Sequence, residues 1–342
     1  MKRAVFVCPG IGGVVAGGGW ALYRSVALVL QQLAEEVVVL GPAGPMDGIG
    51  GAAVATSDGV LRYLDMLSPD LIVKAAGSLS PEEDERLDRE LMDTGSDRRT
   101  SVVYFDCDAP SRIPMLWYQP SYYLSKLLQE GVPVVLWGGG ARAVHGYRSA
   151  GADSVHYLHP PLLYCGLAHA IRCWGIEAAD PCKKVVVSDV SSGDERRERV
   201  DLLLAEASSC GIGTRVVDQR VDPSRWLRAV ADAGIVLNLL RSDVQGFSDL
   251  SASRVFEAVA CGAVLVSEWY QGIDAVVPEP FRISLPSDLR GWQRLSEISE
   301  AELSLKVRGA RQYLECGAKE AFVHAVSVFG GLTPERSCGS WA

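Results

Sequence analysis

Two charged residues of complementary chemistry stand three positions apart in the second half of the chain. Arg254 carries a planar guanidinium that can bind a phosphate through two N–H groups, and Glu257 carries a carboxylate that suits the two hydroxyls of a ribose. At i and i+3, both side chains share one face of a helix. The spacing therefore fits either a ligand with a phosphate and a diol, or an ion pair on the helix surface.

The residues around this pair predict a helix, a turn and a strand. Val255 and Val259 recur at helical spacing, and Gly262 follows them as a helix stop. Residues 263–266 form an apolar run that predicts a buried strand, and residues 267–272 predict a polar loop at its carboxyl end. Ligands of open parallel sheets bind at such loops, so we expect a binding site here.

A second charged pair, Asp106 and Asp108, directly follows the apolar run at residues 102–105. Two carboxylates at i and i+2 can face one side of a turn. One of them can act as a general base for a hydroxyl group, or can anchor that hydroxyl by a hydrogen bond. The structural alternative is an N-cap or Asx-turn, which Asp108 before Ala-Pro fits.

A glycine-rich turn at residues 9–19 follows the first expected strand and includes Gly12 and Gly13. Bare backbone N–H groups ahead of a helix can approach a phosphate. The spacing is neither the dinucleotide fingerprint G-x-G-x-x-G nor a P-loop with its lysine. The turn is interpreted as lining a ligand cleft, the alternative being a flexible lid.

A second glycine run follows residues 134–137 and includes Gly139 and Gly140, with Arg142 close behind. It permits close approach of the backbone to a ligand, and Arg142 could meet a phosphate or a sugar. The alternative is a strand-to-helix turn with a solvated arginine.

Composition excludes several classes of function. The net charge of the 342-residue chain is −9, which argues against nucleic acid as the main partner because phosphate neutralisation needs a basic surface. The nine cysteines include no C-x-x-C pair, and no histidine cluster has complete metal-ligand spacing. His145 is only a weak alternative base. We therefore expect no metal, no cofactor, reduced thiols and a cytoplasmic location, without a signal peptide or a membrane span.

Strand and helix signals alternate twice along the chain, which predicts an α/β protein with two parallel sheets. We expect a first Rossmann-like domain at residues 1–160 and a second at 183–330. Three prolines place a linker at residues 161–182, and residues 331–342 form a tail. The helical pattern at residues 301–328 predicts a long terminal helix.

Four segments together resemble the GT-B glycosyltransferases, most closely the CgeB-like branch. They are VVYFDCDAPS at 102–111, WGGGARAVHGYRSAGA at 137–152, IVLNLLRSDVQGFS at 235–248, and RVFEAVACGAVLVSEWYQG at 254–272. They occur in family order. The resemblance implies the GT-B fold, in which two doubly wound Rossmann-like domains face a cleft and a C-terminal helix crosses back to the first.

The resemblance also implies roles for named residues. In the second domain, Glu257 would hold the ribose of a nucleoside diphosphate sugar, and Arg254 and Arg241 would neutralise its diphosphate. The remaining expected donor-site residues are Asn238, Ser253 and Gly272. Asp249 lies eight residues before Glu257, the spacing of a retaining-enzyme motif, whereas the similar QGFS segment lies twelve before it, so the stereochemistry stays open.

In the first domain, the resemblance places the acceptor. Asp108 and Asp106 would be catalytic, and the cleft residues would be Gly12, Gly13, Gly139, Gly140 and Arg142. An Asp-x-Asp pair also occurs in metal-dependent GT-A transferases, but that fold lacks a second alternating domain. We therefore expect metal-independent transfer to a small hydroxylated acceptor, with natural-product glycosylation as one setting. A GT-B nucleotide-sugar 2-epimerase and a non-catalytic nucleotide-sugar binder are the alternatives.

Overall fold

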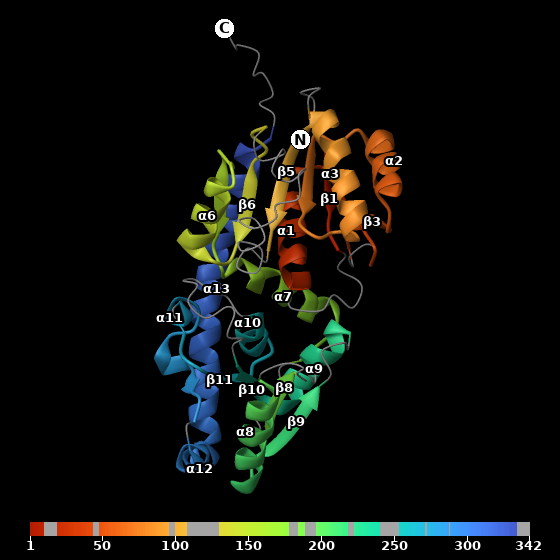
Figure 1. The fold of residues 1–342 in the computed structure, drawn as a ribbon. Coiled ribbons are helices and arrows are strands. Elements are labelled where there is room, and N and C mark those ends of the chain that lie inside the picture. The colour runs from red at the N-terminus through yellow and green to blue at the C-terminus, as the bar shows by residue number, and fades with distance from the viewer. Residues whose placement is uncertain are drawn as a thin grey trace. The chain divides into compact units, whose positions relative to one another are not determined.

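The structure is a computed structural model that describes residues 1–9, 19–43, 48–95, 100–107, 130–177, 184–188, 196–217, 222–239, 253–270, 272–286 and 288–333. These residues form two compact units. The first contains residues 1–13, 23–159 and 321–342, and the second contains residues 14–22 and 160–320. Each unit is built on one parallel sheet (Figure 1).

The sheet of the first unit has seven strands in the order β3-β2-β1-β4-β5-β6-β7, and every neighbouring pair is parallel. The chain moves outward from β1 to β3 and then returns to the other side of β1 at β4. This reversal creates a topological switch point between β1 and β4. The strands are β1 Arg3–Val7, β2 Glu36–Gly41, β3 Gly50–Ala53, β4 Leu71–Ala75, β5 Ser101–Asp106, β6 Val134–Trp137 and β7 Val155–Leu158.

Helices of the first unit bury apolar faces against this sheet. They are α1 Gly19–Leu33, whose first four residues belong to the second unit, α2 Ser57–Leu67, α3 Pro81–Gly95 and α6 Gly140–Ser149. Val60 and Leu64 of α2 share one core with Val5 and Ile72 of the central strands. Nearly continuous apolar runs such as β1 and β4 are typical of strands covered on both faces.

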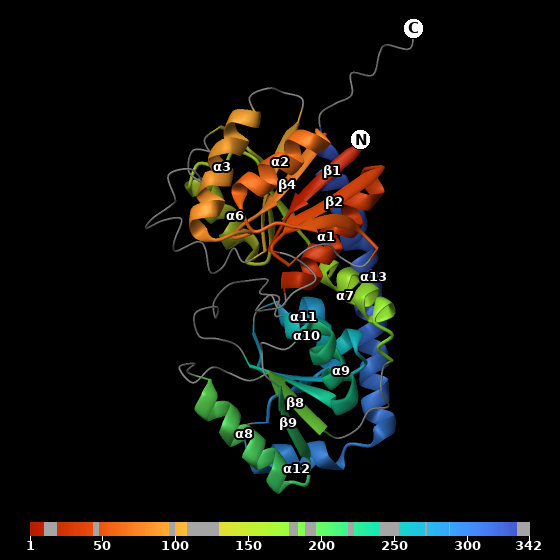
Figure 2. The ribbon, with the colours of Figure 1, turned by 90° about the vertical axis from the view of Figure 1, so that its right-hand side faces the viewer.

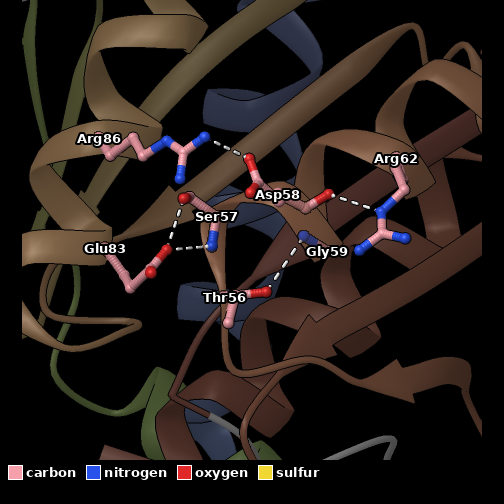
Figure 3. Close-up of polar contacts among 7 residues, drawn as sticks. All are labelled: Thr56, Ser57, Asp58, Gly59, Arg62, Glu83 and Arg86. Carbon is pink, nitrogen blue, oxygen red and sulfur yellow. Dashed lines mark hydrogen bonds and ion pairs between the residues drawn. The ribbon is translucent and has the colours of Figure 1, made fainter.

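A polar network fixes the start of α2, as Figure 3 shows. Thr56 caps the helix by accepting from the backbone N–H of Gly59. Glu83 of α3 accepts from both the backbone N–H and the hydroxyl of Ser57, and Arg86 of α3 pairs with Asp58 at 2.6 Å. The two helices are therefore joined through polar groups as well as through the core.

The sheet of the second unit has five parallel strands in the order β12-β11-β10-β8-β9. Its switch point lies between β8 and β10. The strands are β8 Lys184–Ser188, β9 Gly213–Val217, β10 Gly234–Asn238, β11 Val264–Ser267 and β12 Ile283–Ser284. The expected class, α/β with two doubly wound parallel sheets, is confirmed.

Helices cover both faces of this sheet, with α9 and α10 on one side and α8 and α12 on the other (Figure 2). The helices are α7 Leu162–Cys173, α8 Arg197–Ser209, α9 Pro223–Ala233, α10 Ser253–Ala260, α11 Ile273–Val276, the 3-10 helix η2 Glu279–Phe281, α12 Leu289–Glu297 and α13 Glu300–Gly331. Among the described helices, none combines the length and apolarity needed to cross a bilayer.

The structure corrects the interpretation of residues 161–182 as a linker, because most of the first half of this segment forms the helix α7. Two of the three prolines that suggested a linker, Pro160 and Pro161, stand before the helix, with Pro161 as its N-cap, where a missing N–H costs nothing. Pro181 lies outside the described residues. The chain passes between units at His159, and α13 passes from the second unit to the first at Ala321. The first unit is therefore not the continuous segment 1–160. Of the expected tail, residues 334–342 lie outside the described residues.

Candidate functional site

The helix α10 ends in a Schellman turn that sets the direction of β11. Gly262 adopts φ 77°, a left-handed conformation that favours glycine. Its N–H donates to the carbonyl of Val259 at 3.1 Å, and the N–H of Ala263 donates to the carbonyl of Ala258 at 2.8 Å. The helix stop predicted at Gly262 is confirmed, and β11 begins two residues later.

Glu257 is fully buried on α10, and its two carboxylate oxygens differ. Oε2 accepts from the indole Nε1 of Trp226 at 2.7 Å and from NH1 of Arg254 at 2.6 Å. Oε1 is also buried and has no hydrogen-bond partner among the described residues. A buried carboxylate oxygen that accepts no hydrogen bond is costly, so Oε1 is suited to accept one from a ligand hydroxyl.

Arg254 lies between the carboxylate and an aromatic ring. Its guanidinium carbon stands 4.2 Å from the ring centroid of Trp226, within the range of a cation–π contact. The side chain keeps 23% of its surface exposed, whereas that of Glu257 keeps 1%. The i, i+3 ion pair considered from the sequence exists, but it reaches into the interior rather than lying on a solvated surface.

The surroundings of Glu257 keep a neighbouring thiol neutral. Burial first, and then the negative charge of Glu257, raise the pKa of the Cys261 thiol well above its ordinary value. Arg311 of α13 partly offsets this shift and also donates to the carbonyl of Ala260 at 3.0 Å. Cys261 therefore serves as a small apolar wall rather than as a nucleophile.

Polar groups gather at the carboxyl ends of β10 and β11. Asn238 and Ser267 are register partners, and the amide Nδ2 of Asn238 donates to Oγ of Ser267 at 2.9 Å. The Ser267 hydroxyl in turn donates to the carbonyl of Glu268, whose side chain pairs with Arg199 at 2.5 Å. Trp269 follows with 70% of its surface exposed. This edge adjoins the switch point, where open α/β sheets bind their ligands.

The other expected donor-site residues lie at two chain turns. Ser253 is the first residue of α10 and is half-buried, next to Arg254. Gly272 adopts φ 98° and precedes α11 as its N-cap. Arg241 lies outside the described residues, as do Asp249 and the QGFS segment at residues 245–248.

In the first unit, Asp106 is the last residue of β5 and is fully buried. Its Oδ2 accepts a hydrogen bond from the hydroxyl of Tyr147 on α6. The next residue, Cys107, has its sulfur 3.0 Å from the hydroxyl of Tyr23 on α1. Asp106 thus has a bonded partner within the unit, and Asp108 lies outside the described residues.

The second glycine run is required by the backbone. Gly138, Gly139 and Gly140 have φ values of 85°, 81° and 53°, so all three stand in the left-handed region that side chains disfavour. They turn the chain from β6 into α6 within three residues. Arg142 is exposed on the first turn of α6. Gly12 and Gly13 lie outside the described residues.

The histidines do not form a metal centre, and no group of three or more metal-binding side chains occurs in the described part of the chain. His159 stacks on His324 of α13 with ring centroids 4.2 Å apart, and His156 contacts the hydroxyl of Ser154. His145 is exposed on α6, with Nε2 at 3.5 Å from the Ser149 hydroxyl.

Comparison with known proteins shows which family model and which solved structures the chain resembles. Residues 193–294, which include Trp226, Arg254 and Glu257, match the model of the family described as glycosyl transferase-like. An alpha-glucosyltransferase solved with UDP-glucose and DNA containing an abasic site aligns with a TM-score of 0.66 at 12% identity, covering 96% of this chain and 99% of that chain. The chain has the GT-B glycosyltransferase fold.

Two further solved structures share this GT-B fold. T4 phage BGT, solved with UDP and Mn2+, aligns with a TM-score of 0.56 at 11% identity, covering 97% of this chain and 99% of that chain. HepE of Anabaena, solved with UDP and glucose, aligns with a TM-score of 0.54 at 13% identity, covering 97% and 98%. No curated protein sequence matches the chain. The family model thus matches one part of the chain, and the solved structures share its fold.

One central residue was missed by sequence reasoning. Trp226 on α9 supplies both the N–H donor to Glu257 and the ring beneath Arg254, yet it lies 31 residues before Glu257. Its large apolar ring at a core position of an amphipathic helix carried no signal of a polar role. Only the contact between α9 and α10 reveals it.

Proposed function

We propose that this protein transfers a sugar from a UDP-sugar to a hydroxyl of a small acceptor, without a metal, and that it belongs to the CgeB-like branch of GT-B enzymes. The observation that carries the proposal is the buried Glu257 beside Arg254, whose Oε1 has no hydrogen-bond partner among the described residues. The three solved structures named above contain UDP or UDP-glucose, which supports uridine diphosphate as the nucleotide. The setting that we propose is cytoplasmic natural-product glycosylation.

The donor would bind to the second unit at the carboxyl edge of its sheet. Glu257 Oε1 would accept from a ribose hydroxyl, while Oε2 remains held by its two protein donors. Arg254, together with Arg241, would neutralise the diphosphate. The charge that develops on the leaving diphosphate is the main electrostatic demand of the reaction, so fixed cations there lower its barrier. Asn238, Ser253 and Gly272 complete the proposed donor site.

The acceptor would be activated from the first unit. We assign Asp108 as the general base and Asp106 as its support, because Asp106 is fully buried and already accepts the Tyr147 hydroxyl. A base must reach the acceptor hydroxyl within hydrogen-bond distance. Arg142 and the glycine turns around Gly12, Gly13, Gly139 and Gly140 are the proposed acceptor-side lining.

The net charge of the chain supports a small acceptor over a nucleic acid. One neighbour was solved with DNA, so a nucleic-acid acceptor is the competing assignment. The net charge of −9 opposes the phosphate contacts on which such binding depends. A small hydroxylated molecule avoids this repulsion.

Calorimetry with UDP tests the donor site. Glu257→Gln keeps the size of the side chain but removes its charge and one acceptor oxygen, and we expect about 10- to 100-fold weaker binding. Glu206→Gln is the matched control, because Glu206 also accepts an indole N–H, from Trp292 at 3.1 Å. Equal UDP affinity of wild type and Glu257→Gln would remove the ribose assignment.

Product analysis separates the alternatives. Release of UDP that depends on an added hydroxylated acceptor supports a transferase. Conversion of donor alone to its epimer would favour the 2-epimerase, and tight binding without turnover would favour a non-catalytic binder. Sugar transfer to duplex DNA in place of small acceptors would overturn the acceptor assignment.

A further inference from the structure

Trp226 joins the two charged side chains of the proposed donor site. It lies on α9 with only 5% of its surface exposed, and its indole Nε1 donates to Oε2 of Glu257 at 2.7 Å. The face of the same ring carries the guanidinium of Arg254 at 4.2 Å. One side chain from another helix therefore contacts both charged groups of α10.

The distribution of hydrogen bonds on Glu257 is uneven. Both protein donors reach Oε2, at 2.7 Å from Trp226 and 2.6 Å from Arg254. Oε1 is buried and receives none from the described residues. If either donor moved to Oε1, that oxygen would keep only part of its capacity to accept from a ligand. The geometry around Oε2 thus determines how fully Oε1 is available.

Tryptophan has the chemistry for this arrangement. Its indole N–H is a donor only, so it neither accepts a proton from a ligand hydroxyl nor changes charge with pH. Its ring is the best of the aromatic surfaces for a stacked cation. Because the ring is rigid and buried, the position of one contact determines the position of the other.

We propose that Trp226 is the positioning residue of the donor site. It fixes the orientation of the Glu257 carboxylate, so that Oε1 stays available to accept from a ligand hydroxyl. It also holds the Arg254 guanidinium against its ring, in position for the diphosphate. This inference rests on the proposed function. It adds a residue that touches neither the reacting atoms nor, in this assignment, the donor itself.

The chain offers a matched control for its test. Trp292 on α12 is also fully buried, belongs to the same unit, and also donates its indole N–H to a glutamate, Glu206. Its ring packs in the core formed with α8, on the opposite face of the sheet from α9. Trp226→Phe and Trp292→Phe therefore each delete an indole-to-glutamate hydrogen bond from a buried ring, although Glu206 is half-buried and Glu257 is buried.

The experiment measures UDP affinity by calorimetry and stability by melting for both variants. We expect Trp226→Phe to bind UDP about tenfold more weakly. Without the indole N–H, the Glu257 carboxylate can rotate and pair with Arg254 through either oxygen. Trp292→Phe should lower the melting temperature and leave UDP affinity within about twofold. Affinity within twofold of wild type for Trp226→Phe would overturn the inference.

A double-mutant cycle with Glu257→Gln tests whether Trp226 acts through Glu257. The UDP affinity of the double variant should lie within about twofold of that of Glu257→Gln alone. The reason is that Trp226 can no longer act through a carboxylate that has been removed. Fully additive losses would overturn the proposed route. A wild-type protein that binds neither UDP nor ADP, GDP and dTDP would instead remove the proposed function together with the inference.

Arg254→Lys provides a second reading if Trp226→Phe does not fold. Lysine keeps the positive charge but loses the planar group that stacks on the ring. We expect UDP binding to fall about tenfold while uridine binding changes less than threefold, because uridine lacks the diphosphate. Equal UDP affinity of Arg254→Lys and wild type would show that the stack on Trp226 has no positioning role.

Discussion

Lys74 of β4 is a buried cation that faces two carboxylates in the first unit. Its side chain is 2% exposed, and Nζ stands 2.8 Å from Asp88 Oδ1 and 3.1 Å from Asp84 Oδ2. Both aspartates lie on α3, and Asp84 also accepts from the hydroxyl of Ser78 and the N–H of Leu79. One positive and two negative charges give the cluster a net charge of −1.

We predict that removal of the cation costs far more stability than removal of one carboxylate. Lys74→Met leaves two buried carboxylates facing each other, and loss of one partner from a buried ion pair costs about 3–5 kcal/mol of unfolding free energy. Asp88→Asn leaves one cation with one carboxylate and a neutral cluster. We expect it to change stability by less than about 1 kcal/mol, in either direction.

The pH dependence follows from Asp88. Burial raises its pKa, and the positive charge of Lys74 only partly opposes this. An acid whose pKa is higher in the folded than in the unfolded state, where it is about 3.9, destabilises the folded state at pH 7 and less so as pH falls. Without Lys74 the pKa of Asp88 rises further. The loss of unfolding free energy in Lys74→Met should therefore be greatest at pH 7 and smaller at pH 5.

Hydrogen exchange in a urea series measures this prediction. Peptides from β4 and α3 report the opening free energy of the first unit separately from that of the second. Equal opening free energies for Lys74→Met and wild type at pH 7, or a deficit that grows toward pH 5, would refute the reasoning. Asp88→Asn is the control that retains the cation.

Three further predictions concern the remaining parts of the site. Asp108→Asn should lower kcat by about 10²–10⁴-fold with donor affinity unchanged, whereas Asp106→Asn should lower the melting temperature; full turnover in the first would remove the base assignment. Transfer should persist in EDTA, and activity lost there and restored by Mn²⁺ would return a metal role to the two aspartates. Gly139→Ala should cost about 1–2 kcal/mol because φ is 81° there, and an unchanged melting temperature would contradict this.

The sequence predicts most of the sheet strands because their apolar runs are distinct. The runs at 102–105, 134–137 and 263–266 fall on β5, β6 and β11. The strands β3, β7 and β12 were missed, since GGAA has little apolar content, VHYL is short and mostly half-buried, and β12 has only two residues. For a similar reason, the prolines before α7 were interpreted as a linker although proline fits a helix start.

Within the candidate site, local spacing predicts the contact of Arg254 with Glu257 but not its surroundings. The i, i+3 distance is a property of one helix, and one sequence is enough to reveal it. The depth of Glu257 and its bond to Trp226 depend on α9 and α10 packing side by side. Helical periodicity identifies an inward face but not the helix that it meets, so these features required the fold.

The division of α13 between the two units has a consequence for biosynthesis. Ala321, Ala325 and Phe329 repeat every four residues, are fully buried, and belong to the first unit, where Gly330 adjoins Leu33 of α1. A ribosome that has completed β7 must still synthesise the whole second unit before it delivers this segment. At roughly 5–20 residues per second, the delay is about 10–30 seconds. During that interval the nascent first sheet lacks its last helical turns, which makes it a candidate for chaperone capture.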